Sequence, residues 1–357
     1  MKIAQVSPLY ESVPPKLYGG TERVVAYLTE ELIRQGHEVT LFASGDSITN
    51  ARLVAACDRA LRLDENVKDS LAHHFVQLEQ VFEEAENFDI VHFHAGYLHF
   101  PLFLRQATPF VTTLHGRLDL DDLVPLYRRY KDVPLVSISN HQRMPLPWAN
   151  WQGTVYHGLP NDLLIPGSGG GDYLAFIGRI SAEKRVDRAI EIAQRAGMKL
   201  KIAAKIDAAD REYYHDNVEH LLVDPLVECI GEVDDAGKQD LLGGAYALLF
   251  PIDWPEPFGL VIIEAMACGT PVIAFRRGSV PELIDDGVTG FIVDDIDEAV
   301  AALAKIKDFD RRRCREVFEE RFSAPRMTSD YLKLFARMIE ERPRPRRITD
   351  SIAMMGG

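Results

Sequence analysis

This chain of 357 residues has few cysteines, no long apolar run and no excess of basic charge. Its four cysteines are Cys57, Cys229, Cys268 and Cys314. No two of them form a Cys-x-x-Cys pair, which argues against a disulfide framework or a thiolate metal site and indicates reduced thiols in the cytosol. No apolar run approaches the roughly 18 residues that a membrane-spanning helix needs, so stable membrane insertion is not expected. The net charge of -14 argues against nucleic acid as a partner, because nucleic-acid-binding proteins are usually basic.

Two signatures are also missing from the N-terminal region. Residues 1–6 read as a first β-strand and lack the apolar core of a signal peptide, so we expect a cytoplasmic protein. The glycines that follow, at 19 and 20, lack the Gly-x-Gly-x-x-Gly spacing of a dinucleotide-binding loop. Their spacing therefore disfavours a dehydrogenase.

Short apolar runs alternate with amphipathic stretches along the whole chain, which predicts an α/β fold with parallel sheets. In the first half we expect a helix at 21–35, capped by Thr21, and strands at 3–7, 38–42, 90–93, 110–114 and 135–138. In the second half we expect strands at 173–177, 200–203, 227–230, 247–250, 271–274 and 290–293.

A turn-rich connection at 166–171, Pro-Gly-Ser-Gly-Gly-Gly, separates the two halves. We predict two doubly wound Rossmann-like domains, at 1–165 and 166–325, that face each other across a cleft. Ligands of such sheets bind at the C-terminal edges of the strands, so the site is expected between the domains. A further helix is expected at 326–341. The Pro- and Arg-rich segment 342–357 is expected to be a disordered tail.

The most informative stretch runs from Pro255 to Pro271. It predicts a helix from 258 to about 268 that is apolar on nearly every side and therefore buried. Glu264 lies in the middle of this helix, where a carboxylate costs several kcal/mol unless something pairs with it. A ligand with hydroxyl groups is a suitable partner. Glu256 precedes the helix, whose first N–H groups have no partner within it and hold anions well. Hydroxyls together with phosphates describe a sugar nucleotide.

Two further segments carry glycine or basic residues where a strand gives way to a helix. Gly19 and Gly20 allow backbone to approach a bulky anion at a helix start, although an ordinary turn has the same composition. Gly178 and Arg179 follow a strand, and Ser181 is predicted to cap the next helix, which places Lys184 in its first turn. On one interpretation, Arg179 and Lys184 clamp the diphosphate of a ligand. On the other, they are two solvated cations on the surface.

The histidines admit two interpretations. His115 follows a strand end, where active-site residues gather, and is a candidate for function. His92 and His94 lie two residues apart on a strand and so share one face. With His99 and His115 they could hold zinc, but no acidic or thiolate ligand has matching spacing nearby. A buried hydrogen-bonded pair is the commoner arrangement. The loops 97–104, 118–130 and 144–151 are rich in aromatic residues, which suits a flat or sugar-like acceptor or ordinary packing.

Taken together, these residues resemble the family 4 glycosyltransferases, retaining sugar-nucleotide enzymes with the GT-B fold. The likeness extends over nearly the whole chain. Its strongest part is the pair Glu256 and Glu264, set in Glu-Pro-Phe-Gly and followed by Ala-x-Ala-x-Gly-x-Pro-Val. The Gly-Arg-x-x-x-x-Lys segment at 178–184 adds independent support.

The resemblance implies roles for the residues around the predicted helix at 258–268. Glu264 is expected to bind the ribose hydroxyls of the donor. Glu256 is expected to hold the transferred sugar, together with the backbone amides of Phe258, Gly259 and Leu260.

The resemblance also assigns the remaining donor contacts. Arg179 and Lys184 are expected to grip the diphosphate, Gly19 and Gly20 to let it approach, and His115 to lie near the reactive face of the sugar. We expect the domain at 1–165 to bind the acceptor and the domain at 166–325 to bind the nucleotide sugar. The family pattern further implies that the C-terminal helix crosses back onto the first domain. The enzymes of this family usually work without a bound metal, in keeping with the lack of an Asp-x-Asp motif in a suitable loop.

The predicted function is therefore the retaining transfer of a hexose from a nucleotide diphosphate sugar, with UDP-glucose as the default donor, to an acceptor hydroxyl. No metal or other cofactor is expected, and the acceptor is a small molecule or a glycan. Two alternatives stay open. A sugar-nucleotide 2-epimerase of the same architecture would share the donor grip but need further acid and base groups around C2. A non-catalytic sugar-nucleotide-binding protein would not need both carboxylates and both cations.

Overall fold

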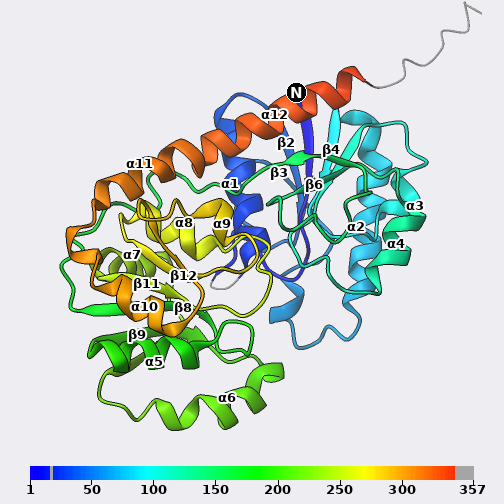
Figure 1. The fold of residues 1–357 in the computed structure, drawn as a ribbon. Helices are drawn as coiled ribbons and strands as arrows, with labels where there is room; N and C mark the ends of the chain where they lie inside the picture. The colour runs from blue at the N-terminus through cyan, green and yellow to red at the C-terminus, as the bar shows by residue number, and fades with distance from the viewer. Residues whose placement is uncertain (17–18, 342–357) are drawn as a thin grey trace, which may run out of the picture.

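The computed structural model describes residues 1–16 and 19–341, which form two lobes (Figure 1). Tyr18 and the predicted tail at 342–357 lie outside the described residues. Each lobe is built on a parallel sheet with helices on both faces, which confirms the predicted α/β class of two Rossmann-like domains. Within the described residues, no helix is both long and apolar enough to cross a membrane.

The first sheet has seven strands in the order β3-β2-β1-β4-β5-β6-β7, and all neighbouring pairs are parallel. Its strands are β1 (Lys2–Val6), β2 (Glu38–Ala43), β3 (Arg52–Ala55), β4 (Ile90–Phe93), β5 (Phe110–Thr113), β6 (Leu135–Ser137) and β7 (Trp151–Thr154). The sequence predicted every strand of this sheet except β3 and β7. These two lie at the edges, where partial exposure removes the continuous apolar run that marks a buried strand.

The second sheet has six parallel strands in the order β10-β9-β8-β11-β12-β13. Its strands are β8 (Tyr173–Arg179), β9 (Lys199–Lys205), β10 (Val227–Gly231), β11 (Ala247–Phe250), β12 (Val272–Phe275) and β13 (Gly290–Val293). All six were predicted within about two residues of their bounds. In both sheets the strand order reverses beside the first strand of the lobe. That reversal opens a crevice at the C-terminal ends of the strands.

The helices of the first lobe are α1 (Gly20–Arg34), α2 (Ser70–Glu84), α3 (Phe100–Phe103) and α4 (Leu123–Arg129). The second lobe carries α5 (Val186–Ala196), α6 (Arg211–Asn217), α7 (Asp235–Gly244), α8 (Leu260–Ala267), α9 (Val280–Leu283), α10 (Ile296–Leu303) and α11 (Arg311–Arg321). The last described helix is α12 (Ala324–Glu340). Apolar side chains of both lobes and of α12 form the largest buried cluster.

Three predicted helix starts are wrong. The first helix begins at Gly20 with Gly19 as its N-cap, so Thr21 lies inside it. The helix predicted from 258 begins at Leu260, because Gly259 adopts a left-handed conformation with φ 89°. Ser181 does not cap α5. Its carbonyl accepts from the N–H groups of Lys184 and Arg185, which closes a separate turn, and α5 begins only at Val186.

The helix α12 runs from the second lobe to the first across the side of the molecule shown at the top of Figure 1. At its start, the N–H of Ala324 donates to the carbonyl oxygen of Leu159 at 2.7 Å. Farther along, α12 packs against α1, and the fully buried Tyr331 forms a 3.0 Å hydrogen bond with the Thr113 hydroxyl at the end of β5. This helix therefore ties the two lobes together.

We predict that Tyr331→Ala lowers the free energy of unfolding by about 3–5 kcal/mol, because it removes a buried ring and leaves a cavity. The measurement is denaturant unfolding monitored by circular dichroism. The matched control on the same helix is Lys333→Ala, whose side chain is 75% exposed and which should change stability by no more than about 0.5 kcal/mol. Equal effects of the two substitutions would contradict the anchoring role of Tyr331.

Candidate functional site

A cavity of about 820 Å³ lies between the lobes, with walls from both. All the residues that the sequence singled out for donor binding or catalysis line it. They are Gly19, Gly20, His115, Gly178, Arg179, Lys184, Glu256, Phe258, Gly259, Leu260 and Glu264. The C-terminal ends of parallel strands face this cavity, as expected for doubly wound sheets.

The N-terminus of α8 forms one wall of the cavity. Gly259 turns the chain into the helix with a left-handed conformation that other residues rarely adopt. No acceptor for the N–H groups of Phe258, Gly259 and Leu260 is found among the described residues. Three free donors at a helix start favour an anionic or hydroxyl-rich ligand.

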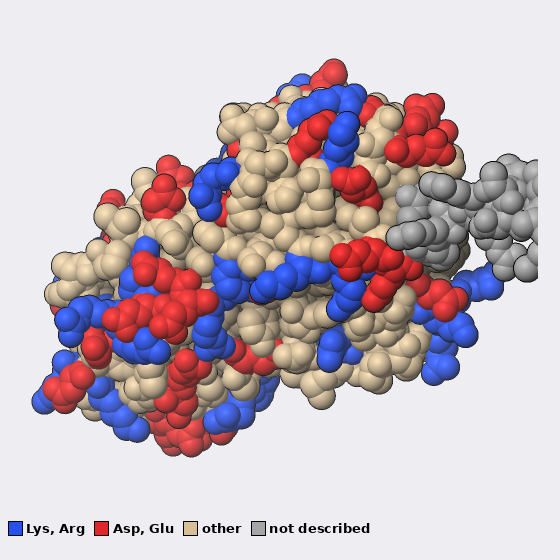
Figure 2. Space-filling view, turned by 90° about the horizontal axis from the view of Figure 1, so that it is seen from above, with Lys and Arg blue, Asp and Glu red and all other residues tan. Residues whose placement is uncertain are grey.

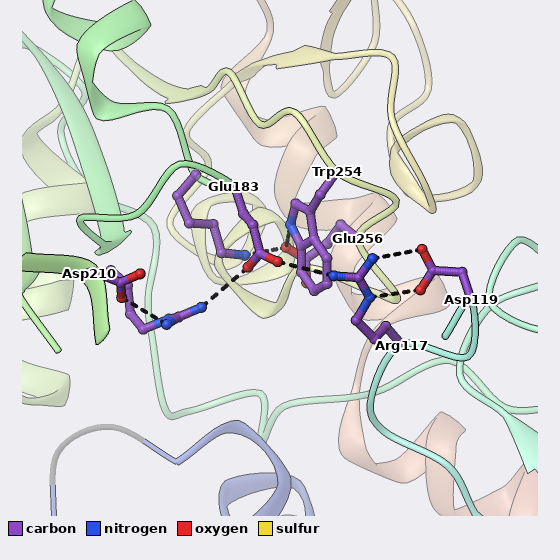
Figure 3. Close-up of polar contacts among 8 residues, drawn as sticks. Arg117, Asp119, Glu183, Asp210, Trp254 and Glu256 are labelled. Atoms are coloured by element: carbon purple, nitrogen blue, oxygen red, sulfur yellow. Dashed lines mark hydrogen bonds and ion pairs between the residues drawn. The ribbon is translucent and has the colours of Figure 1, made fainter. Parts of the chain in front are cut away.

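Glu256 and Lys184 form an ion pair beside this helix start. The Trp254 indole N–H also donates to the same Glu256 oxygen at 3.1 Å (Figure 3). The side chains of Lys184 and Glu256 are only 17% and 11% exposed, so little solvent screens the pair. Lys184 therefore lies in the turn closed by Ser181 and not in the first turn of a helix, as the sequence predicted. In this position its ammonium group points at the Glu256 carboxylate.

A chain of charges crosses from Asp210 in one lobe to Asp119 in the other (Figure 3). Arg179 is one member of this chain. Its guanidinium pairs with Asp210 at 2.9 Å and with Glu183 at 3.3 Å. Glu183 in turn pairs at 3.3 Å with Arg117 of the first lobe, which also holds Asp119 at 2.7 Å. A diphosphate at Arg179 would therefore exchange with carboxylates that already neutralise the guanidinium.

Glu264 is 3% exposed, and its carboxylate pairs with the Lys238 ammonium of α7 at 2.6 Å. The sequence predicted a buried carboxylate that needs a partner and assigned that place to a ligand. The structure gives it a partner from the protein, which sequence reasoning missed because no motif marks Lys238. Nη1 of Arg23 in α1 donates to both carboxylate oxygens of Asp235 in the same α7, at 2.7 and 2.9 Å, so this ion pair also joins the lobes.

The glycine loop of the first lobe approaches the cavity at the start of α1. A Cβ on Gly19 would lie 2.7 Å from Cβ of Pro15, so the loop admits no larger residue without rearrangement. Glu22, one turn into α1, also lines the cavity, and burial raises the pKa of its carboxyl to about 7. The sequence assigned Glu22 no role, since burial of one carboxyl in a polar helix leaves no pattern.

His115 sits at the end of β5, where its Nε2 lies 2.8 Å from Nδ1 of His94. Nε2 of His94 lies 2.8 Å from Oε1 of Gln5, a carbonyl oxygen that only accepts. His94 therefore donates to Gln5, and His115 donates to His94. Burial lowers the pKa of His115 to about 3, so its ring is neutral.

The histidines are thus a hydrogen-bonded set. His92 and His99 bond to the hydroxyls of Thr113 and Thr112, each at 2.7 Å. Among residues 1–16 and 19–341, no group of three His, Cys, Asp or Glu is placed to hold a metal ion.

Two family models match this chain, one for each lobe. The model described as "Glycosyltransferase Family 4" matches residues 18–151, and "Glycosyl transferases group 1" matches residues 166–319. Together they cover both walls of the cavity.

The chain belongs to the family 4-like glycosyltransferases. This confirms the predicted family, GT-B fold and enzyme class.

Among known proteins, this family 4-like chain is 24% identical over 350 residues to an uncharacterised glycosyltransferase of Methanocaldococcus jannaschii, covering 82% of this chain and 85% of that protein. Several other curated relatives match over less than half of their own length. The crystal structure of AviGT4, a glycosyltransferase involved in avilamycin A biosynthesis, has a TM-score of 0.74 at 24% identity, over 96% of this chain and 98% of that one. Anabaena HepE in complex with UDP and glucose has a TM-score of 0.73 at 17% identity, over 94% and 100%.

We predict that Lys238→Met lowers the free energy of unfolding by about 3–5 kcal/mol, because the buried Glu264 carboxylate loses its partner. The double variant Lys238→Met with Glu264→Leu should recover most of the loss. The control is Lys2→Met, whose exposed ammonium lies 3.8 Å from the exposed Glu38 carboxylate, with an effect of at most about 0.5 kcal/mol. Denaturant unfolding measures all three, and a double variant as unstable as the single one would contradict the pairing.

We also predict that His115 contributes to the pH dependence of the free energy of unfolding. Its pKa lies near 3 in the folded state and near ~6.5 in the unfolded state, so its contribution to stability is fully present above about pH 6.5. The contribution is lost as the pH falls toward 3, since only the unfolded state takes up the proton. The free energy of unfolding of His115→Gln should therefore fall less steeply between pH 7 and 4 than that of the wild type. Parallel curves would contradict a neutral buried ring.

Proposed function

We propose that this enzyme transfers a hexose, with retention at C1, from a nucleotide diphosphate sugar to an acceptor hydroxyl without a metal ion. UDP-glucose is the default donor. The observation that carries the proposal is that two carboxylates, two cations and the free N–H groups of α8 line one cavity. The carboxylates are those of Glu256 and Glu264, and the cations are Arg179 and Lys184. The complex of the fold relative HepE with UDP and glucose supports the choice of donor.

Donor binding exchanges internal contacts for contacts to the ligand. The ribose hydroxyls would donate hydrogen bonds to the Glu264 carboxylate, which would keep Lys238 as its second partner. The diphosphate would replace Asp210 and Glu183 at Arg179, and would draw Lys184 from Glu256. Glu256, relieved of the ammonium, would accept from hydroxyls of the hexose beside the N–H groups of Phe258, Gly259 and Leu260. Arg179, Lys184, Glu256 and Glu264 thus each keep a partner throughout.

The reaction breaks the bond between C1 of the hexose and the oxygen of the β-phosphate. Negative charge grows on the departing diphosphate, where Arg179 and Lys184 stabilise it. The acceptor hydroxyl attacks C1 from the side of the leaving group, and the departing phosphate takes its proton. No protein nucleophile is assigned, and the neutral ring of His115 offers the hexose an uncharged hydrogen-bonding group.

The test is a transfer and hydrolysis assay with a panel of nucleotide sugars. We predict that Lys184→Ala lowers kcat by roughly 10²–10³, the usual loss for one donor that stabilises transition-state charge. Glu264→Gln should weaken binding of the donor and of the free nucleotide. The control is Lys201→Ala, which removes a cation outside the cavity and should leave both quantities unchanged.

The same assay separates the alternatives. A binding protein would bind nucleotide without turnover, and Lys184→Ala would then change affinity alone. A 2-epimerase would yield an epimerised sugar and free nucleotide in the absence of any acceptor. Retention is read from the anomeric configuration of the product by NMR. An inverted product, or activity that chelator abolishes and a divalent metal restores, would refute the corresponding part of the proposal.

A further inference from the structure

Part of the cavity wall opposite the second lobe is apolar, although Thr21, Glu22, Arg23 and His115 of the first lobe also line the cavity. This apolar part is formed by the first lobe, and its large side chains come from three loops or helix starts at the C-terminal edge of the first sheet. Tyr10 follows β1, Leu71 lies in the first turn of α2, and Tyr97 and Leu98 precede α3. Tyr10, Leu71 and Tyr97 are 43%, 46% and 40% exposed, so they present their apolar surface to the space in the cavity and its mouth.

The imidazole of His74, beside these apolar side chains, is already engaged within the protein. The Nδ1 atom of His74 lies 2.8 Å from the carbonyl oxygen of Ser70, and its Nε2 atom accepts from the N–H of Leu9 at 3.4 Å. The Tyr10 ring lies against the His74 ring with centroids 5.0 Å apart, which fixes both. A sugar ring placed here would give up hydrogen bonds to water without regaining them.

Two arginines of the first lobe line the cavity, and both are paired. Arg23 pairs with Asp235 at 2.7 Å. Arg62 of η1 (Leu61–Leu63) pairs with Glu11 at 2.8 Å. The apolar surface continues beyond the cavity. Leu63 is 47% exposed beside Arg62, and Phe75 is 57% exposed four residues after Leu71, on the same face of α2.

We propose that this wall binds the aglycone of the acceptor, and that this aglycone is an aromatic or similarly flat apolar group carried by a soluble molecule. The proposal rests on the proposed function, since the donor occupies the charged wall of the second lobe and the acceptor must face it. Aromatic rings pair well with the faces of Tyr10 and Tyr97. The net charge of -14 disfavours an anionic lipid surface as the source of the apolar group.

A matched pair of probes tests the proposal: phenyl β-glucoside and methyl β-glucoside, which differ only in the apolar group. Binding of each is measured by saturation-transfer NMR and as an acceptor KM. The phenyl compound should bind about tenfold more tightly, as burial of a ring predicts. Leu71→Ser and Tyr97→Ser should each reduce this ratio severalfold while leaving donor hydrolysis unchanged. The matched control is Ile48→Ser, an 80% exposed aliphatic residue of the same lobe that does not line the cavity.

The outcomes separate this subsite from the proposed function. A ratio near one, or a ratio that the two variants do not change, overturns the subsite even if donor is turned over. Transfer that requires vesicles of anionic lipid overturns it in favour of a membrane-borne acceptor. If no nucleotide sugar is bound or hydrolysed while the phenyl preference and its dependence on Leu71 persist, the apolar subsite stands and the proposed function fails.

Discussion

The requirement that buried charge be paired governs the organisation of this molecule. Glu264 and Glu256 are largely buried, and they pair with the ammonium groups of Lys238 and Lys184 respectively. Arg179 is held by Asp210 and Glu183. These pairs let a charged site persist in the absence of substrate, because unpaired ions in such surroundings would destabilise the fold by several kcal/mol each. They also make the site exchangeable, since a ligand with hydroxyls and phosphates can replace one member of each pair.

Some of the ion pairs around the cavity join the two lobes, so they depend on how the lobes are placed relative to each other. Arg117 reaches Glu183, and Arg23 reaches Asp235, in each case from the first lobe to the second. On a third side, Glu282 of α9 accepts from the backbone N–H groups of Asn140 and His141 at 2.7 and 2.6 Å. The helix α12 fixes the separation from the outside. The face of the molecule in Figure 2 carries basic and acidic side chains in neighbouring groups. A small change in the relative position of the lobes would therefore first alter the distances within the ion pairs that border the cavity.

The sequence predicted the parts of this structure that leave a local pattern. Continuous apolar runs mark the buried strands, and Glu264 was conspicuous because a carboxylate interrupts an apolar helix. The half-exposed edge strands β3 and β7 leave no such run. The start of α5 was misplaced because a cap-like Ser181 closes a turn, and the left-handed Arg185 then separates that turn from the helix. Lys238 could not be predicted at all. Its role comes from the packing of α7 on α8, a contact between segments about 26 residues apart in the chain.

The two walls of the cavity differ in chemistry, and each is therefore suited to a different part of a ligand. The wall of the second lobe offers charges and free N–H groups, which select a ligand by the positions of its hydroxyls and phosphates. Part of the first lobe's wall offers apolar surface beside His74 and Arg62, which are already bonded within the protein. Apolar contact is less directional than hydrogen bonding, so such a wall constrains the size and flatness of a ligand more than its functional groups. Under the proposed function, directional contacts of the second lobe would hold the bond that breaks, while the first lobe would bring in the acceptor hydroxyl and exclude competing water.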